Sequence, residues 1–233
     1  MDWIQNDHAD RFSLLEHAGT ALERACRAAI QRDGEAFLAL AGGQTPLPLY
    51  AWLGAIDWAG RVLAVPTDDR CVPHAHPASN VGQLQATLGG NPQASVLALT
   101  SPEGGADDSL ALARAAMAAH PQPFDLVLLG MGADGHFASL FAGAAGIEEA
   151  LAPTTGTDVV AITPHPLPAS APWPRISLTL SRLLRAREIH LLATGEDKRA
   201  VLDACRASAS APYPLAALLH ADAPAPIHIH WSP

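Results

Sequence analysis

Asp134 and His136 stand two residues apart in a glycine-rich turn, and together they could perform acid–base chemistry. A mostly apolar run at 124–129 precedes them and predicts a buried strand. Glycine fills three of the seven positions 130–136, and it lets a backbone approach a ligand closely. The imidazole could act as a base that the carboxylate orients, or the two side chains could contact a ligand separately. The alternative is a plain connection to a helix starting within 137–141, with an exposed or capped histidine.

A second glycine turn follows the predicted strand at 36–41. Gly42 and Gly43 open this turn, and Thr45 and Pro46 lead into a predicted helix. Free backbone N–H groups at a helix start, beside two glycines, can bind an anion. An ordinary strand-to-helix turn also favours glycine, so the motif alone does not decide between the two.

Charged side chains follow the next predicted strand, 61–66. Asp68, Asp69 and Arg70 come almost directly after it, at a carboxyl edge where open α/β sheets bind ligands. A solvated acidic loop with an internal ion pair is the alternative. Ser79 is a plausible N-cap for a helix that continues to about residue 88.

Two cations occupy comparable places near the end of the chain. Arg175 begins the alternating segment 175–180, which predicts a strand with one wetter face. A strand is predicted at 189–193, and a helix follows from Gly195 to about residue 207. Lys198 would lie in the first turn of that helix, where its charge opposes the helix dipole unless an anion is bound. A solvated lysine is the alternative.

The sequence offers little for metal or thiol chemistry. His74 and His76 have a spacing that can bind a metal, whereas His228 and His230 share one face of a predicted terminal strand and are more simply surface or interface residues. Neither pair has a third ligand at a convincing spacing, so we predict no metal and no other cofactor. The three cysteines are odd in number and widely spaced, which predicts reduced thiols in a cytoplasmic protein.

The remaining segments alternate between helix and strand. Helices are predicted at 10–32, 109–120 and 212–220, and strands at 95–99, 159–162 and 226–231. Segment 163–174 holds five prolines and is predicted to be a loop, which could lie over a site. We therefore predict one doubly wound α/β domain over 1–233, with a mostly parallel sheet and helices on both faces.

Charge and composition exclude two classes of partner. The formal net charge is −9, whereas nucleic-acid binding needs a basic face. No run reaches the ~18 apolar residues of a membrane span, and no basic region with an apolar core opens the sequence, so neither an anchor nor a signal peptide is expected. An anionic small molecule can still bind where a few cations are placed.

Four segments, taken together, resemble those of the 6-phosphogluconolactonases, which are similar in fold to the glucosamine-6-phosphate deaminases. The segments span most of the chain. They are AGGQTP at 41–46, DDRCVP at 68–73 with SN at 79–80, GMGADGHFASLF at 130–141, and RISLT at 175–179 with GEDK at 195–198. The third segment is the most specific. The resemblance implies a Rossmann-like sheet fold and a small sugar phosphate as the ligand.

The resemblance also implies a reaction, the hydrolysis of 6-phospho-D-glucono-1,5-lactone to 6-phospho-D-gluconate in the oxidative pentose phosphate pathway. It implies that His136 is the general base that activates water and that Asp134 orients or supports the imidazole. Arg70, Arg175 and Lys198 would surround phosphate or sugar oxygens. The other residues implied at the ligand are Gly42, Gly43, Thr45 and Asp68. We expect a monomer or a small homo-oligomer.

Two positions depart from the pattern of these lactonases. Asp69 stands where glutamate is usual, and Gln44 stands where serine is usual. One alternative is an amino-sugar-phosphate deaminase or isomerase of the same fold, which would carry a glutamate shortly after the Asp-Gly-His turn. Residues 137–143 contain no acid, and Glu148 comes too late to match. The other alternative is a non-enzymatic sugar-phosphate sensor, which would normally add a basic DNA-binding segment that this sequence lacks.

Overall fold

A seven-stranded sheet, in which every neighbouring pair is parallel, forms the centre of the computed structural model, which describes residues 3–165 and 172–233. The strand order is β1 (Trp3–Asp7), β10 (Ile227–Ser232), β9 (Ile189–Thr194), β6 (Leu126–Gly130), β2 (Glu35–Leu40), β3 (Arg61–Pro66) and β5 (Ala94–Val96). Six of these strands match predicted ones to within a few residues, whereas β1 is not predicted by the sequence. Part of the predicted proline-rich loop, 166–171, lies outside the described residues.

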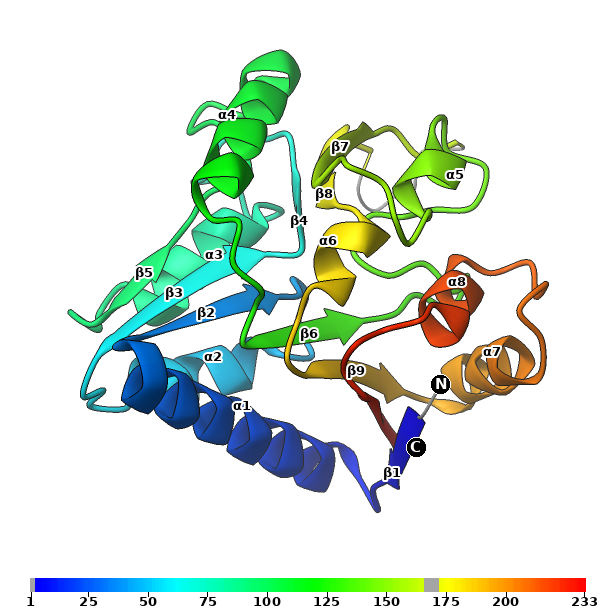
Figure 1. Cartoon of the computed structure of the whole chain (residues 1–233), viewed down its shortest axis with the longest axis horizontal. Coiled ribbons are helices and arrows are strands. Elements are labelled where there is room, and N and C mark those ends of the chain that lie inside the picture. The colour runs from blue at the N-terminus through cyan, green and yellow to red at the C-terminus, as the bar shows by residue number, and fades with distance from the viewer. Residues whose placement is uncertain (1–2, 166–171) are drawn as a thin grey trace.

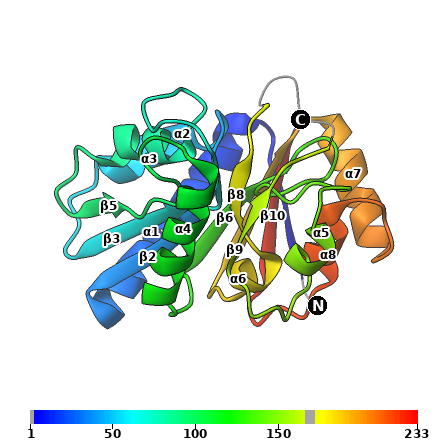
Figure 2. The same ribbon diagram turned by 90° about the horizontal axis from the view of Figure 1, so that it is seen from above.

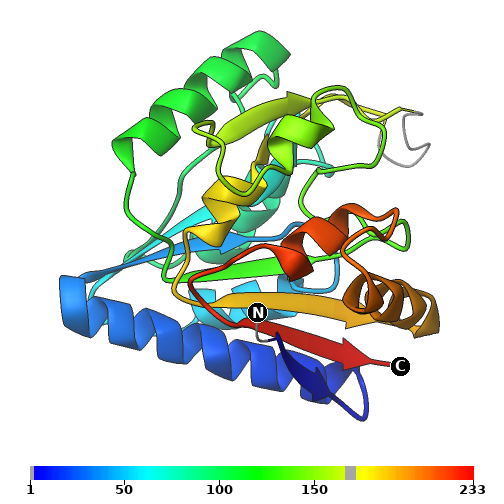
Figure 3. The same ribbon diagram turned by 45° about the vertical axis from the view of Figure 1, so that its right-hand side comes forward.

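Helices cover both faces of this sheet, which confirms the predicted doubly wound arrangement. One face carries α1 (Arg11–Asp33), α2 (Leu47–Gly54) and α3 (Asn80–Leu88). The other carries α4 (Ala106–Ala119), α6 (Leu180–Leu184), α7 (Glu196–Ala207) and α8 (Pro214–His220). Figures 1 and 3 show α1 running below the sheet and α6 and α8 above it. Figure 2 shows β5 and α3 at one end of the molecule and α7 and α8 at the other.

The strand β2 shows how the sequence builds both layers. Ala36, Leu38 and Leu40 point into the core between the sheet and α1. Phe37 and Ala39 point into the core on the other face of the sheet, which α4 and α6 cover. Because side chains alternate along a strand, a central parallel strand must be apolar at nearly every position. That is why the run AFLAL predicts a buried strand.

The boundaries of α1 follow from its capping residues. The Asp10 side chain accepts a hydrogen bond from the Ser13 backbone N–H at 2.8 Å, which satisfies a free donor at the helix start. Gly34 ends the helix in the left-handed conformation, with φ of 78°. The prediction of a helix over 10–32 is confirmed.

A second sheet is not predicted by the sequence. It is antiparallel and contains β4 (Asp68–Arg70), β8 (Arg175–Leu178) and β7 (Val159–Ile162), in that order, with α5 (Ile147–Ala150) beside it. The prediction that 175–180 has a wetter face is wrong, because β8 is the central strand and all four of its residues are buried. Asp68–Arg70 is a strand rather than a solvated loop because it pairs with β8.

The segment 137–141 is a tight turn, so the prediction that a helix could start there is wrong. Phe137 forms isolated bridges with Met131 and Leu140, and both Phe137 and Leu140 are fully buried. Ala138 between them adopts φ of 48°, a left-handed conformation that a right-handed helix cannot contain. The two apolar side chains are therefore core anchors for the turn that carries His136.

The sheet topology has a switch point between β2 and β6. From β2 the chain builds outward through β3 to β5, whereas β6 lies on the other side of β2 and leads through β9 to β10. Crevices outside the carboxyl ends of strands at such points are the usual ligand sites of open α/β sheets. The turns after β2 and β6 are the two glycine turns of the sequence.

Histidines line up on the sheet face that α1 covers. The His190 Nε2 atom lies 3.2 Å from Glu188 Oε2, His230 Nε2 lies 3.0 Å from His190 Nδ1, and His8 Nε2 lies 3.1 Å from His230 Nδ1. The carboxylate can only accept, so each imidazole donates to the next group from Nε2. His230 is 4% exposed, so the interpretation of it as a surface residue is wrong.

This histidine chain is expected to make the fold less stable in mild acid. Burial, with a smaller contribution from His190, lowers the pKa of His230 to about 3, and burial also lowers the pKa of His8 and His228. The unfolded chain takes up these protons near pH 6.5, whereas the folded chain resists them. The contribution of His230 to stability is therefore fully present above about pH 6.5 and falls by about 1.4 kcal/mol per pH unit as the pH drops toward 3. Urea unfolding between pH 7 and 5 measures this slope, and His230→Gln should flatten it, while an unchanged slope would contradict this account.

Candidate active site

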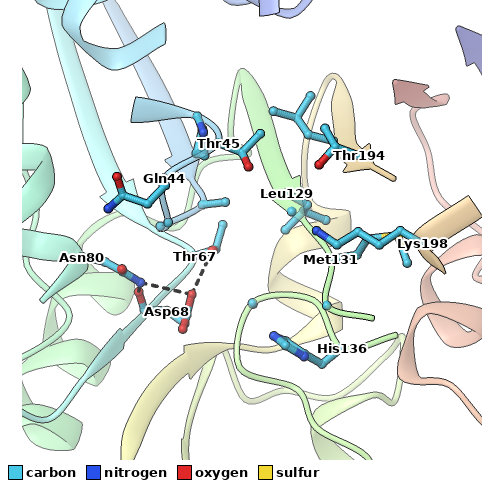
Figure 4. A pocket seen from close by; sticks show the side chains of 18 of the residues that line it. Gln44, Thr45, Thr67, Asp68, Asn80, Leu129, Met131, His136, Thr194 and Lys198 are labelled. Carbon is cyan, nitrogen blue, oxygen red and sulfur yellow. Dashed lines mark hydrogen bonds between the residues drawn. The ribbon is translucent and has the colours of Figure 1, made fainter. Parts of the chain in front are cut away.

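A cavity of about 280 Å³ opens at the switch point. Its walls come from the segments that follow β2, β3, β6 and β9. Seven of the predicted site residues line it, namely Gly42, Gly43, Thr45, Asp68, Arg70, His136 and Lys198. Figure 4 shows Lys198 and His136 both reaching into this space, with Asp68 and Thr45 across from them. The structure thus brings together residues that are up to 156 positions apart, from Gly42 to Lys198.

His136 is held by Asp134 at one ring nitrogen. The His136 Nδ1 atom lies 2.5 Å from Asp134 Oδ1, and this hydrogen bond is the main cause that lowers the pKa of Asp134. A carboxylate that accepts at Nδ1 fixes the tautomer that bears its proton there, which leaves Nε2 without a proton. His136 lines the cavity and Asp134 does not, so the pair has the arrangement of a base and its orienting carboxylate.

Gly132 is required for this pair by close approach. A Cβ at position 132 would lie 2.3 Å from His136 Nδ1 and 2.4 Å from Asp134 Oδ1. Neither contact is possible for a side chain, so the hydrogen bond between the two residues needs glycine here. Among the glycines of this turn, Gly132 therefore leaves the room that the hydrogen bond between Asp134 and His136 needs.

Asp69 organises the opposite wall without lining the cavity. Its carboxylate is fully buried and accepts hydrogen bonds from the Asn80 backbone N–H at 2.6 Å and from the Thr100 hydroxyl at 2.8 Å. Burial raises the pKa of Asp69 despite these donors. Asp69 therefore ties the start of α3 to β4, which is a structural role.

Asn80 is a site residue that the sequence analysis does not single out for a role. Its Nδ2 donates to the Asp68 carbonyl oxygen at 2.7 Å, and its Oδ1 accepts from Arg70 at 3.4 Å. A Cβ on Gly42 would lie 2.0 Å from Asn80 Oδ1, so the glycine turn packs directly on this amide. The only signal in the sequence is the Ser79-Asn80 pair itself, since Ser79 caps α3 as predicted.

Arg175 is the one predicted substrate-binding residue that is absent from the cavity wall. It is 2% exposed and stands opposite Arg70 in the pairing of β4 with β8. Its guanidinium carbon lies 4.7 Å from the centre of the Phe141 ring. Burial lowers the pKa of Arg175. A direct contact of Arg175 with substrate therefore stays a prediction without support from this geometry.

Lys198 lies in the first turn of α7, as predicted, and is half-buried. Glu196 and Asp197 precede it and complement the helix dipole. Across residues 3–165 and 172–233, no ion pair involves Lys198, although its neighbour Arg199 pairs with Asp7. The amine is thus available to an anion in the cavity.

The structure assigns ordinary structural places to the other reactive residues. Burial raises the pKa of Cys71 to about 11, and Cys71 does not line the cavity. His74 lies 3.0 Å from the Thr100 carbonyl oxygen, and His76 packs edge-on against Trp173. In the described part of the chain, no group of three or more His, Cys, Asp or Glu residues could hold a metal ion. None of the described helices is long and apolar enough to cross a membrane.

Comparison with known proteins gives a consistent result. The model of the family described as glucosamine-6-phosphate isomerases/6-phosphogluconolactonase matches residues 9–228. A 6-phosphogluconolactonase of Mesorhizobium japonicum is 39% identical, over 93% of this chain and 89% of its own length. One of Caulobacter vibrioides is 37% identical, over 95% and 94%. The crystal structure of a 6-phosphogluconolactonase from Shewanella baltica superposes with a TM-score of 0.88 at 30% identity, covering 100% of this chain and 98% of that one.

Proposed function

The chain belongs to the glucosamine-6-phosphate isomerase/6-phosphogluconolactonase family, and we propose that it hydrolyses 6-phospho-D-glucono-1,5-lactone to 6-phospho-D-gluconate. This is the lactone hydrolysis of the oxidative pentose phosphate pathway. The observation that carries the proposal is the convergence of His136, oriented by Asp134, and Lys198 on one cavity at the switch point. A base and a cation that share a cavity suit a substrate with a carbonyl at one end and a phosphate at the other.

The reaction needs one proton carrier. His136 takes a proton from water through Nε2 as the water oxygen attacks C1 of the lactone, which produces a tetrahedral oxyanion. The oxyanion then collapses, the bond from C1 to the ring oxygen breaks, and the imidazolium returns its proton to that oxygen. The product is the open-chain acid. A lactone is already an activated ester, so a histidine near neutral pH is sufficient as the base.

The remaining lining residues hold the substrate in this scheme. Lys198 and Arg70 bind phosphate or sugar oxygens through charge-assisted hydrogen bonds. Asp68 accepts hydrogen bonds from sugar hydroxyls, and its position is fixed by Ser139, whose hydroxyl donates to it at 2.5 Å. Gly42, Gly43 and Thr45 offer backbone N–H groups and a hydroxyl across the cavity. Because these residues come from most of the length of the chain, we treat 1–233 as one lactonase domain.

The deaminase alternative lacks its acid in the cavity. No glutamate lines the cavity among the described residues, and Glu148 lies instead beside Gly143 and Ile147 in a separate surface depression.

We propose a cytoplasmic location for the protein. Cys26 and Cys205 are buried free thiols, which suits this setting.

Turnover of the lactone tests the proposal and separates an enzyme from a sensor. The substrate is generated enzymatically, and its loss is followed with correction for spontaneous hydrolysis, in the presence of excess chelator. We expect fast turnover that the chelator does not reduce. Binding of the substrate without turnover would favour a sensor, release of ammonia from an amino-sugar phosphate would favour a deaminase, and loss of activity that zinc restores would contradict the metal-free scheme.

A further inference from the structure

We propose that Phe141 is a positioning residue for His136, and that Arg175 acts on the reaction through Phe141 rather than as a ligand of the substrate. This inference rests on the proposed role of His136 as the base. It assigns a task to two residues that the scheme above leaves without one. Neither of them lines the cavity.

The hydrogen bond to Asp134 fixes only one edge of the His136 ring. The Asp134 side chain is 61% exposed and the His136 side chain is 28% exposed, so water competes for this contact. An imidazole held at Nδ1 alone can still tilt about that nitrogen. Its Nε2 atom would then swing away from the water it must activate. A second contact is needed to fix the plane of the ring.

Phe141 supplies that second contact. The centres of the His136 and Phe141 rings are 4.1 Å apart, with an angle of 27° between their planes. This is a stacked arrangement that restricts tilting of the imidazole. Phe141 lies only five residues after His136, beyond the turn at Ala138, so the local fold brings the two rings together.

Arg175 is a second neighbour of the phenyl ring. Its guanidinium carbon lies 4.7 Å from the ring centre. Phe141 is therefore in contact with both the imidazole of His136 and the guanidinium of Arg175. Guanidinium groups stack well on aromatic faces. The three side chains thus form a row of contacts, and His136 is the member of this row that lines the cavity.

The two backbone segments that carry these side chains, the turn at 136–141 and β8, are both held in place. Ser139 is 1% exposed, its hydroxyl donates to Asp68 at 2.5 Å, and its backbone N–H donates to the Ser177 hydroxyl at 3.2 Å. Arg175 is held by the pairing of β8 with β4 and β7. The contacts among His136, Phe141 and Arg175 therefore join the turn that carries His136 to the second sheet. The position of His136 depends on the turn and on this sheet.

Kinetics of Phe141 variants test the inference. Phe141→Leu keeps an apolar side chain of similar size but removes the flat ring. We expect kcat to fall about 10-fold, because a displacement of about 1 Å at a reacting group can cost up to about 100-fold. KM should stay within about twofold, because a group that acts only in the transition state does not change ground-state binding. Phe141→Tyr keeps the stack and should retain most of kcat.

Two further variants complete the kinetic test. Phe12→Leu is the matched control, since Phe12 is 76% exposed on α1 and should leave kcat unchanged. Arg175→Lys keeps the charge without the planar group, so it should lower kcat rather than raise KM. Combining it with Phe141→Leu should be no worse than the poorer single variant. Wild-type kcat in Phe141→Leu, or a rise in KM alone in either variant, would overturn the inference.

A spectroscopic measurement keeps the test independent of the proposed reaction. In the wild type, the ring current of Phe141 should shift the His136 ring protons upfield in the NMR spectrum, and Phe141→Leu should move them downfield and broaden them. Unchanged His136 resonances would overturn the inference even if the wild type were an active lactonase. If the wild type showed no turnover, the proposed function would fail, and this spectrum alone would decide the position of the ring.

Discussion

His136→Ala is expected to fold normally and to lose at least about 100-fold in kcat on 6-phosphogluconolactone, which is the usual size of a general-base contribution. The reason is geometric. The imidazole reaches the cavity with Nδ1 occupied by Asp134 at 2.5 Å, so Nε2 is the atom that can accept a proton from water. Steady-state kinetics with purified protein, corrected for spontaneous hydrolysis, measures the loss.

Two controls make the His136 result specific. His17→Ala removes an exposed histidine on α1 and should leave kcat unchanged. Asp134→Asn should cost less than His136→Ala, about 10-fold, because the amide oxygen can still accept from Nδ1 while the negative charge is lost. Thermal unfolding should give the same midpoint for His136→Ala as for the wild type. A folded variant with near-wild-type kcat would show that another group carries the proton.

The sequence predicts the parallel sheet well because its signals are local. Runs such as Ala36–Leu40 and Leu126–Leu129 are apolar at every position, and glycine turns follow both. A strand that is buried on both faces must read this way, whatever it pairs with. The cavity could be located for the same reason, since the carboxyl ends of parallel strands meet at one edge of the sheet.

The second sheet could not be predicted because its signals are not local. Asp68–Arg70 is a polar strand of three residues, and its partner β8 lies more than a hundred positions later in the chain. Without that pairing, Arg175 reads as an exposed cation at the start of a strand. With it, Arg175 is the buried first residue of the central strand, and it does not line the cavity. The burial of His230 was hidden in the same way, since it depends on α1 lying across β10.

A contact between side chains is also invisible in the sequence when each residue has an obvious local role. Ser79-Asn80 reads as a helix start, and Ser79 does cap α3. Asn80 has the additional task of joining the Gly42 turn, Asp68 and Arg70. Phe141 reads as part of an apolar segment, yet it stacks on His136. Both assignments need three-dimensional distances.

Lys198 is the second residue whose removal is expected to have a large effect. It is the only lysine in the sequence, where every other long cationic side chain is arginine. It lines the cavity from the first turn of α7, and in the described residues it has no anionic partner of its own. A compact ammonium at the start of a helix, beside free backbone N–H groups, is suited to a phosphate dianion.

We expect Lys198→Ala to raise KM for the phosphorylated lactone by about 10- to 100-fold, because a charge-assisted hydrogen bond is worth about 1.5–3 kcal/mol. The same change should hardly affect hydrolysis of unphosphorylated gluconolactone, which the wild type should already process poorly. Steady-state kinetics on both lactones measures this difference. Binding should weaken as salt is added, because partly exposed charges are screened.

Arg199→Ala is the matched control for Lys198→Ala, since it removes a neighbouring cation that pairs with Asp7 and packs on Trp231 away from the cavity. It should leave KM unchanged.

The single lysine permits a chemical test as well, because an amine-specific reagent can modify only Lys198 and the chain's α-amino group. We expect 6-phosphogluconate to protect Lys198, and not the α-amino group, from such a reagent. Equal modification with and without this ligand, or an unchanged KM in Lys198→Ala, would mean that the phosphate is held by Arg70 and the glycine turn instead, and that the lone lysine faces solvent in the complex.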